Sequence, residues 1–337
     1  MISLIALISI LASFFVSLFL LPRWIKKAEE LGWVWDDMNK TKWGKIPGSG
    51  GVIVVLGFVI GVLLYIAYWV LYLNNVDGFL VEMLAMLSVV LLLGCIGFID
   101  DLFGWMKGGL SRRSRIILVF IASIPVIAIN AGEGVVNAPL IGLVDLGLVY
   151  PLVFIPIGII GATTTYNFLA GFNGLESGQG IILLTALGIV SYFVGLGWLT
   201  VAALCMAASL CAFMLFNFFP AKVFPGDVLT YPVGGLIAVI AVLGSFEKIA
   251  IFFFIPYILE VVLKLRGRLV MHSFGKPLKK GLDLRYDKIY SLNHLSIYLM
   301  KKAGIRPGEK KVVLSIWLFQ IVVIIIGFII FRGGIFA

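Results

Sequence analysis

Two adjacent carboxylates at the end of an apolar run are the first residues whose position suggests chemistry. Asp100 and Asp101 follow the run Gly94-Cys-Ile-Gly-Phe-Ile, and we expect them at the C-terminus of a helix. The helix dipole disfavours each carboxylate there by roughly 0.3–1 kcal/mol, and neighbouring like charges add to this cost. A purely structural role would favour Lys or Arg. The pair therefore indicates a site that binds a cation or handles a substrate proton.

Two further oxygen-bearing side chains could share a divalent cation with this pair. Asn167 lies in a Gly-rich turn, and Asp227 precedes an apolar run in the motif Val223-Phe-Pro-Gly-Asp227. Taken alone, Asp227 is typical of a helix N-cap. Together with the acid pair on one side of a membrane, the two residues predict a Mg²⁺ site with sparse protein ligands, which substrate phosphates complete. Mn²⁺ accepts similar oxygen ligands.

Two loops have a composition that suits a phosphorylated ligand. The segment from Tyr166 to Gly180 contains four glycines, which allow the backbone to approach a ligand closely, and it leads into a helix start that suits an anion. Composition alone fits an ordinary Asn–Gly turn at least as well, with Glu176 at the helix start. The arginines of Leu110-Ser-Arg-Arg-Ser-Arg115 either fix membrane topology or bind phosphate.

Both histidines lie in the long basic segment 264–311. His272 comes close behind an apolar run and could touch a substrate. His294 lies in a short amphipathic stretch from Tyr290 to Met300, and we expect it to be a packing residue.

Apolar helices must position all of these residues. The chain has 337 residues, of which 61% are hydrophobic and 13% charged, and a mean hydropathy of +1.12. Soluble domains are about 25% charged, so lipid must be the solvent for much of this surface. A membrane span needs roughly 20 apolar residues. Such runs occur near residues 2–22, 49–73, 80–99, 115–131, 148–166, 179–196, 198–219, 229–244, 249–265 and 312–331.

The sequence therefore predicts an all-α polytopic membrane protein of ten transmembrane helices, forming a single multi-pass domain over residues 1–337. The first run lacks a basic start and a small-residue cleavage site, so we expect a spanning helix there rather than a removable signal peptide. The three cysteines lie inside apolar runs and are interpreted as packing residues.

The positive charges predict the orientation. With the N-terminus outside, the cytoplasmic loops contain 24 of the 26 Lys and Arg residues, and the long basic loop 264–311 holds half of the total. This bias explains the net charge of +9 without a nucleic-acid partner. The cytoplasmic loops are residues 23–48, 100–115, 167–178, 220–228 and 264–311.

Three motifs carry a resemblance to a known family. They are Phe98-Ile-Asp100-Asp101-Leu, Asn167-Phe-Leu-Ala-Gly-Phe-Asn173-Gly-Leu-Glu176-Ser-Gly-Gln and Val223-Phe-Pro-Gly-Asp227. In this order they resemble the signature loops of the polyprenyl-phosphate N-acetylhexosamine-1-phosphate transferase superfamily. The second motif is most similar to the eukaryotic and archaeal branch, the UDP-N-acetylglucosamine–dolichyl-phosphate N-acetylglucosamine-1-phosphotransferases. The resemblance covers essentially the whole chain, because ten spans and five cytoplasmic loops are also that family's arrangement.

The resemblance implies a reaction and its partners. A polyprenyl or dolichyl phosphate would attack the β-phosphorus of a UDP-N-acetylhexosamine and release UMP, as the first step of lipid-linked glycan assembly for protein N-glycosylation or a cell-envelope polymer. Asp227 and Asn167 would bind Mg²⁺ on the pyrophosphate. Asp100 and Asp101 would position or deprotonate the lipid phosphate. Membrane lipid surrounds such an enzyme, and a homodimer is the implied oligomeric state.

The resemblance also implies substrate-binding residues. Arg115 would hold the pyrophosphate, Asn173 with Gly174 would meet uracil, and His272 would belong to a sugar-binding loop. Glu176, in the same motif as Asn173, counts among the substrate-binding residues. The chain departs from the family pattern at Gly50, Gly104, Thr164, Met271 and Ser273, which leaves the identity of the sugar open.

Two alternatives remain open from the residues. One is a membrane transporter that couples ions through Asp100 and Asp101, although a transporter should carry its ionisable groups near the bilayer midplane in repeated halves. The other is the same chemistry on a different UDP-sugar, for cell-wall precursor synthesis. Compact outer loops favour a prokaryotic, archaeal cell membrane, with the endoplasmic reticulum as the alternative, and an active site that faces the cytoplasm.

Overall fold

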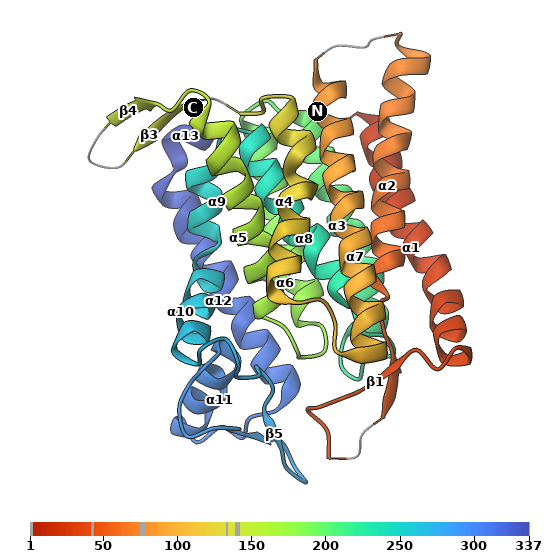
Figure 1. Ribbon diagram of the computed structural model, residues 1–337, viewed down its shortest axis with the longest axis vertical. Coiled ribbons are helices and arrows are strands. Elements are labelled where there is room, and N and C mark those ends of the chain that lie inside the picture. Colours follow the sequence, from red (N-terminus) through yellow and green to blue (C-terminus); the bar gives the residue numbers. More distant parts are fainter. Residues whose placement is uncertain (1–2, 42–43, 75–77, 133, 139–141, 337) are drawn as a thin grey trace.

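The computed structural model is a helical bundle with short strands at its two ends (Figure 1). It describes residues 3–41, 44–74, 78–132, 134–138 and 142–336. The start of the first predicted span at residue 2, and residues 42–43 of the first predicted loop, lie outside the described part. The helices are α1 Leu4–Glu30, α2 Gly51–Ala67, α3 Phe79–Lys107, α4 Arg112–Ala128, α5 Ile155–Phe168, α6 Leu175–Phe193, α7 Gly197–Asn217, α8 Asp227–Leu243, α9 Glu247–Phe253, α10 Ile255–Arg266, α11 Leu292–Lys302, α12 Glu309–Ile330 and α13 Arg332–Ile335.

Within the described residues, seven helices are long and apolar enough to cross a membrane, which confirms the prediction of an all-α polytopic membrane protein. The other three predicted spans coincide with shorter helices: α4, α8, and the pair α9 and α10. The count of ten spans stays a prediction. Figure 1 shows the two chain ends at the same end of the bundle, as an even number of crossings requires. The long helices are Leu4–Glu30, Gly51–Tyr72, Phe79–Met106, Tyr150–Phe168, Leu175–Phe193, Gly197–Asn217 and Glu309–Ile330.

Two helices continue beyond the predicted ends of their spans. α1 passes through Pro22 and reaches Glu30. α3 ends at Lys107, where Gly108 adopts a left-handed conformation with φ 97°. The expectation that the acid pair Asp100–Asp101 ends its helix is therefore wrong. The residues after the pair, Leu-Phe-Gly-Trp-Met-Lys, continue the helix until a glycine permits the left-handed turn.

Glycines and serines let the helices approach closely at the centre of the bundle. A Cβ on Gly57 or Gly61 of α2 would overlap the serine side chains of α1, and a Cβ on Gly97 of α3 would lie 2.4 Å from the carbonyl oxygen of Asp227 in α8. Without a hydrophobic driving force in lipid, such close backbone contacts are a main source of helix association. The contact at Gly97 brings the acid pair of α3 beside the start of α8.

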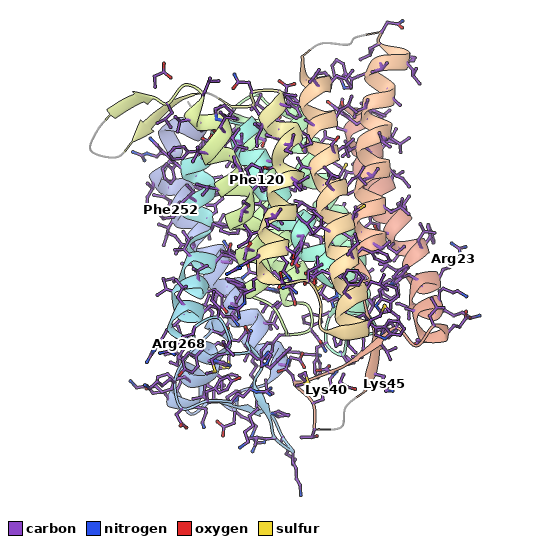
Figure 2. All side chains as sticks on the ribbon, viewed as in Figure 1. Arg23, Lys40, Lys45, Phe120, Phe252 and Arg268 are labelled. Atoms are coloured by element: carbon purple, nitrogen blue, oxygen red, sulfur yellow. The ribbon has the colours of Figure 1, made fainter. Side chains whose placement is uncertain are left out.

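Five connecting segments lie at one end of the bundle, which we call the loop end (Figure 1): residues 31–50 (of which 31–41 and 44–50 are described), 108–111, 169–174, 218–226 and 267–308. Hydrogen bonds between Gly50 and Phe224 and between Asn39 and Gly171 join these segments. Arg112, at the start of α4, donates a further bond to the Leu269 carbonyl. Figure 2 shows Lys40, Lys45 and Arg268 toward this end, whereas Phe120 and Phe252 lie farther from it.

The sequence did not predict the three antiparallel hairpins. They pair β1 Val34–Asp36 with β2 Lys45–Pro47, β3 Val135–Ala138 with β4 Gly142–Asp145, and β5 Lys276–Pro277 with β6 Leu282–Asp283. Two further segments, η1 Tyr68–Tyr72 and η2 Tyr150–Phe154, are π-helical. The predicted long loop 264–311 is ordered by β5, β6 and α11, which packs on α10 and α12.

Candidate active site

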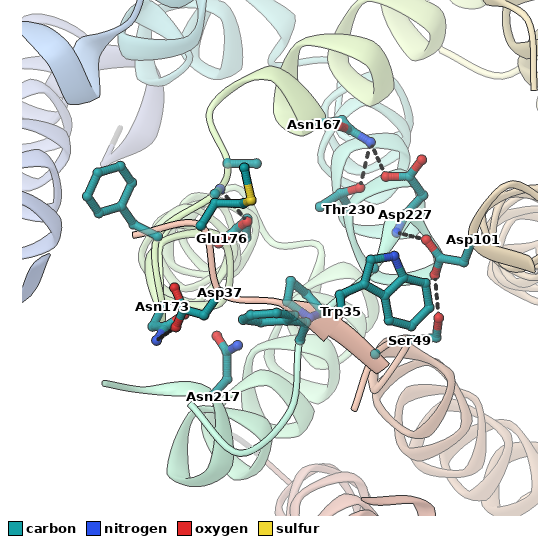
Figure 3. Close-up of a pocket in the computed structure, with 18 of the residues that line it drawn as sticks. Trp35, Asp37, Ser49, Asp101, Asn167, Asn173, Glu176, Asn217, Asp227 and Thr230 are labelled. Atoms are coloured by element: carbon teal, nitrogen blue, oxygen red, sulfur yellow. Dashed lines mark hydrogen bonds between the residues drawn. The ribbon is translucent and has the colours of Figure 1, made fainter. Parts of the chain in front are cut away.

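A cavity of about 470 Å³ opens at the loop end (Figure 3). The turn between α5 and α6, the start of α8 and the segment around β1 all contribute to its wall. Five of the residues predicted from the sequence line it: Asp101, Asn167, Asn173, Glu176 and Asp227. The other lining residues are Trp35, Asp36, Asp37, Met38, Gly48, Ser49, Ala170, Gly171, Phe172, Asn217, Phe224, Pro225, Gly226, Thr230 and Phe274.

The carboxylate of Asp101 caps the first turn of α8. Its Oδ1 accepts a hydrogen bond of 2.7 Å from the backbone N–H of Asp227, and its Oδ2 accepts bonds from the Val228 N–H and, over 2.8 Å, from the Ser49 hydroxyl. The N-cap of α8 is Gly226, which has no side chain to do this. Asp227 is therefore the first helical residue and not the N-cap that its sequence position suggested. A carboxylate is favoured at a helix N-terminus because free N–H groups point there.

Gly226 is needed at this junction for two reasons. Its φ of 73° lies in the left-handed region, and a Cβ would come within 2.1 Å of Oδ2 of Asp101. A side chain at residue 226 would therefore strain the backbone and push the carboxylate away. The glycine of the Pro-Gly-Asp sequence in the third motif is thus required by its contact with Asp101 of the first motif.

Asn167 and Asp227 are hydrogen-bonded to each other on one wall of the cavity. The Asn167 amide donates from Nδ2 to Oδ1 of Asp227 over 2.5 Å and to the Thr230 hydroxyl over 3.2 Å. Figure 3 shows Asn167, Thr230, Asp227 and Asp101 in one group along a single side of the cavity. The structure therefore brings together the three predicted residues Asp101, Asn167 and Asp227.

Asp100 does not line the cavity and has its own set of partners. It is 2% exposed, and its carboxylate forms an ion pair with Arg115 at 2.6 Å. It also accepts hydrogen bonds from the Leu110 N–H and from the Tyr231 hydroxyl. Neither Asp100 nor Arg115 is among the residues that line the cavity. Their predicted roles toward the lipid phosphate and the pyrophosphate stay predictions.

Asn173 is held at the far end of the cavity. Its backbone N–H donates to Glu309 over 2.9 Å, and its Nδ2 donates to Oδ2 of Asp37 over 3.2 Å. Asp37 in turn pairs with Lys40 at 2.5 Å. Because these contacts fix the amide nitrogen, the orientation of the carboxamide oxygen is fixed as well.

Glu176 and Gly174 shape the turn that carries Asn173. Oε1 of Glu176 accepts a hydrogen bond from the Gly171 N–H over 2.9 Å. Gly174 has φ 86° and does not line the cavity, and its N–H donates to Oδ1 of Asn217. Nδ2 of Asn217 donates to the Val223 carbonyl, so this residue ties the second motif to the third.

Neither histidine is among the residues that line the cavity. His272 is exposed and its ring stacks on Phe274, which lines the cavity, whereas His272 itself does not. His294 is fully buried; its Nε2 contacts the Phe274 carbonyl and its Nδ1 accepts from the Tyr290 N–H. Burial lowers the pKa of His294. The expectation of a packing role for His294 is confirmed.

The residues present fit a divalent cation of the Mg²⁺ type. Among the described residues, no group of three or more His, Cys, Asp or Glu side chains could hold a metal ion by itself. Asp101, Asp227 and Asn167 line the cavity. A flip of the Asn167 carboxamide by about 180° would exchange its nitrogen and oxygen and so present the oxygen to a cation. Mg²⁺ is commonly held by one or two carboxylates together with substrate phosphates. A sparse set of oxygen donors beside an open cavity matches that pattern.

Sequence reasoning missed the residues of the segment between α1 and α2. Trp35, Asp37 and Ser49 line the cavity, and Trp33 stacks on Trp105 of α3 to hold β1 in place. The local signal was weak, because charged and aromatic residues after a span are also expected from topology alone. Ser49 and its partner Asp101 are 52 residues apart in the sequence, and Asp37 and its partner Asn173 are 136 residues apart.

Comparison with known proteins gives the geometry a context. Residues 83–245 match the family described as glycosyl transferase family 4. The chain is 33% identical over 331 residues to a protein of Saccharolobus solfataricus provisionally named UDP-N-acetylglucosamine–dolichyl-phosphate N-acetylglucosaminephosphotransferase, and the alignment covers 95% of this chain and 96% of that relative.

Two more distant relatives come from a eukaryote and a bacterium. The UDP-N-acetylglucosamine–dolichyl-phosphate N-acetylglucosaminephosphotransferase of Dictyostelium discoideum is 30% identical over 254 residues, which cover 64% of this chain and 59% of the relative. The phospho-N-acetylmuramoyl-pentapeptide-transferase of Clostridium perfringens is 30% identical over 222 residues, which cover 64% of this chain and 65% of the relative.

Proposed function

This chain belongs to glycosyl transferase family 4, and from that membership we propose that it transfers N-acetylglucosamine 1-phosphate from a UDP-sugar to a polyprenyl phosphate of the dolichyl type. The observation that carries the proposal is the convergence of Asp101, Asn167 and Asp227, from three separate motifs, on one cavity at the loop end of a membrane-spanning bundle. A lipid acceptor and a water-soluble nucleotide can meet at such a boundary.

The reaction forms one phosphorus–oxygen bond and breaks another. An oxygen of the lipid phosphate attacks the β-phosphorus of the UDP-sugar, the bond from that phosphorus to the bridging oxygen breaks, and UMP leaves with the bonding electrons. Such a transfer needs alignment and charge stabilisation more than covalent chemistry by the protein. Asp101 lines the cavity and accepts three hydrogen bonds, from the Asp227 and Val228 N–H groups and the Ser49 hydroxyl, which leaves an acceptor position on its carboxylate free. We therefore assign it the role of positioning the lipid phosphate or accepting its proton.

We propose that Asn167 and Asp227 bind the ion that the reaction requires, Mg²⁺ or Mn²⁺. The ion would neutralise charge on the pyrophosphate. The protein's own contribution is to hold the two side chains in place. Asp227 is fixed through its backbone by Asp101, and Asn167 is fixed by Asp227 and Thr230.

We assign recognition of the base to Asn173. Its Nδ2 is occupied by Asp37, and among the described residues no protein donor contacts its Oδ1. A fixed carboxamide oxygen at the end of a cavity accepts a hydrogen bond from an imide N–H, as uracil presents. The ion pair of Asp37 with Lys40 supports this orientation.

A second UDP-sugar substrate is supported by the name of one relative. The relative of Clostridium perfringens is named for phospho-N-acetylmuramoyl-pentapeptide rather than for N-acetylglucosamine. The same transfer from a UDP-N-acetylmuramoyl donor, for cell-wall precursor synthesis, is therefore the second candidate. The higher identity and coverage of the Saccharolobus relative favour N-acetylglucosamine.

We further propose that the loop end faces the cytoplasm of a prokaryotic cell membrane. The enrichment of Lys and Arg in the loops of this end supports that orientation. A membrane-impermeant thiol reagent tests it on Lys302→Cys, at the exposed end of α11, in a background without the native cysteines. Labelling in inverted vesicles but not in sealed cells is expected, and the reverse pattern would contradict the orientation.

The proposed reaction is tested with purified protein in detergent, polyprenyl phosphate, Mg²⁺ and a panel of UDP-sugars. UMP and a lipid pyrophosphate-linked N-acetylglucosamine, identified by mass, are expected only when both substrates are present. UMP release without acceptor would indicate a hydrolase. Turnover of UDP-N-acetylmuramoyl-pentapeptide alone would support the second candidate.

A further inference from the structure

The turn between α5 and α6 carries no regular structure, yet it connects two residues of the proposed site. Asn167 lies in the last turn of α5 and Asn173 lies just before α6. Their separation depends on the backbone of Leu169–Phe172. Ala170 and Gly171 of this turn line the cavity, as does Phe274 from the segment after α10.

Asn39 holds this turn from one side. Its Nδ2 donates to the Gly171 carbonyl over 2.5 Å, and its Oδ1 accepts from the Gly275 N–H over 3.1 Å. The side chain is 6% exposed. Both ends of one carboxamide are therefore used to join three segments that are far apart in the sequence.

Asn293 holds the same turn from the other side. Its Nδ2 donates to the Ala170 carbonyl over 3.2 Å and to the Ser273 carbonyl over 3.3 Å, and the residue is fully buried in α11. Asn39 and Asn293 thus bind consecutive residues of the turn, and each also binds the segment Ser273–Gly275. The ring of Phe274 packs on Gly171 between them, where a Cβ would lie 2.7 Å from the ring.

We infer that Asn39 and Asn293 form a clamp of two positioning residues, which fixes Ala170–Gly171 against Ser273–Gly275 and thereby sets the spacing of Asn167 and Asn173 for the nucleotide-sugar. The inference rests on the proposed function. Neither asparagine is among the residues that line the cavity, and Asp101 and Asp227 are held by separate contacts. The clamp therefore acts on donor binding, and the chemical step at saturating donor is preserved.

The chemistry of the carboxamide provides an isosteric variant. Asn39→Asp keeps the shape of the side chain but places a carboxylate oxygen against the Gly171 carbonyl, where a donor is required. A lost hydrogen bond with an unsatisfied buried partner corresponds to roughly a tenfold or larger change in an equilibrium constant. We expect Asn39→Asp and Asn293→Asp to raise KM for the UDP-sugar about tenfold or more, with kcat changed less than about threefold.

The controls are surface residues of the segments that contain the two asparagines. Thr41→Ala and Lys302→Ala alter exposed side chains of the same segments and should leave KM unchanged. Asn39→Gln keeps a donor and an acceptor and should recover part of the affinity lost in Asn39→Asp. In Asn39→Ala/Asn293→Ala, the KM effect should be smaller than the product of the single effects, because either change frees the same turn.

Binding of UDP-N-acetylglucosamine by calorimetry, without acceptor, separates this inference from the proposed function. If the wild-type protein binds the nucleotide-sugar but forms no product, the proposed reaction fails while the clamp can still be measured. Weaker binding in both Asp variants, with both surface controls unchanged, supports the clamp. The clamp would be overturned if KM and binding were unchanged, or if the loss were confined to kcat. It would also be overturned if the effects multiplied in the double variant, or if the Asp variants lost thermal stability while their nucleotide affinity stayed intact.

Discussion

The backbone N–H of Asp227 donates a 2.7 Å hydrogen bond to Oδ1 of Asp101, so a carboxylate from α3 caps the helix that begins with the second carboxylate. Two acids that would repel each other are held together because one of them binds the positive end of the other's helix. The same contact positions Asp227 toward Asn167. A single relationship thus provides both the local stability and the arrangement of the proposed site.

Loss of the Asp101 carboxylate should affect both stability and activity. Asp101→Asn replaces one acceptor oxygen by an amide that cannot accept from α8 and Ser49 together. We expect a loss of about 1–3 kcal/mol in stability, together with a loss of UMP release of more than about 100-fold. Thermal unfolding in detergent and initial rates measure the two effects.

Ser49→Ala is a milder change at the same contact than Asp101→Asn. It removes only the 2.8 Å hydrogen bond to Asp101 and leaves the helix cap in place, so it should cost about 1 kcal/mol and retain measurable activity. Equal activity of Asp101→Asn and the wild type would contradict the role of Asp101.

The ion pair of Asp100 and Arg115 should behave as a structural unit. Asp100 is 2% exposed and bonded by Arg115, Tyr231 and the Leu110 N–H. We expect Asp100→Asn to reduce stability by about 1–3 kcal/mol, since the side chain of Arg115 is 37% exposed and solvent weakens the pair. Activity per folded molecule should fall less than in Asp101→Asn.

A double-mutant cycle of Asp100→Asn and Arg115→Gln tests whether the two residues act together. A coupling energy in thermal stability supports the structural unit. A loss of kcat in Asp100→Asn as large as that of Asp101→Asn, without destabilisation, would instead favour the direct catalytic role that the sequence suggested.

The metal requirement should depend on Asn167. Activity should vanish with a chelator and return with Mg²⁺ or Mn²⁺, because both ions accept oxygen ligands. Asn167→Ala should raise the Mg²⁺ concentration for half-maximal activity on the order of tenfold or more. Asp287→Asn, at an exposed position in the long loop, is the matched control. An unchanged Mg²⁺ dependence in Asn167→Ala would remove Asn167 from the metal site.

Acid should loosen the wall of the cavity through His294. Burial lowers the pKa of this histidine, and its Nδ1 accepts from the Tyr290 N–H, which a protonated ring cannot do. Because the folded-state pKa lies below the ordinary value of about 6.5, the unfolded chain takes up the proton first as the pH falls. The stabilising contribution is therefore complete above about pH 6.5 and is lost as the pH falls from there through the lowered pKa.

Thermal unfolding of wild type and His294→Gln between pH 7.5 and pH 5 measures this contribution. Other buried groups titrate in both proteins, so the difference between the two curves is the informative quantity. The difference should shrink on acidification, whereas His272→Gln, at an exposed position, should follow the wild type. Parallel curves for His294→Gln and wild type would contradict the prediction.

The sequence predicted the helices better than it predicted which side chains share a cavity. Runs of apolar residues are a local signal, and each predicted span corresponds to a helix or helix pair. Asp100 and Asp101 were treated as one pair, but successive residues on a helix point in different directions. Because α3 continues to Lys107, this rule separates them: Asp101 caps the first turn of α8 and lines the cavity, whereas Asp100 pairs with Arg115 and Tyr231 and does not line it.

Contacts between distant loops account for what the sequence left out. Asn39, Asp37 and Ser49 each reach a partner more than fifty residues away. Neither hydrophobic period nor turn composition reports such pairs, because both describe only neighbouring residues. These three residues have short polar side chains and lie in a basic loop. Nothing in their residue type distinguished them from the loop residues that only determine membrane topology.

Release of UMP by wild type and Asp227→Asn, compared in one assay with UDP-N-acetylglucosamine, polyprenyl phosphate and Mg²⁺, tests the central claim most directly. Asp227→Asn keeps the size of the side chain and the backbone bond to Asp101. The account predicts Mg²⁺-dependent release by the wild type and a loss of more than about 100-fold in the variant, with thermal stability retained. Equal rates in the two proteins would contradict it.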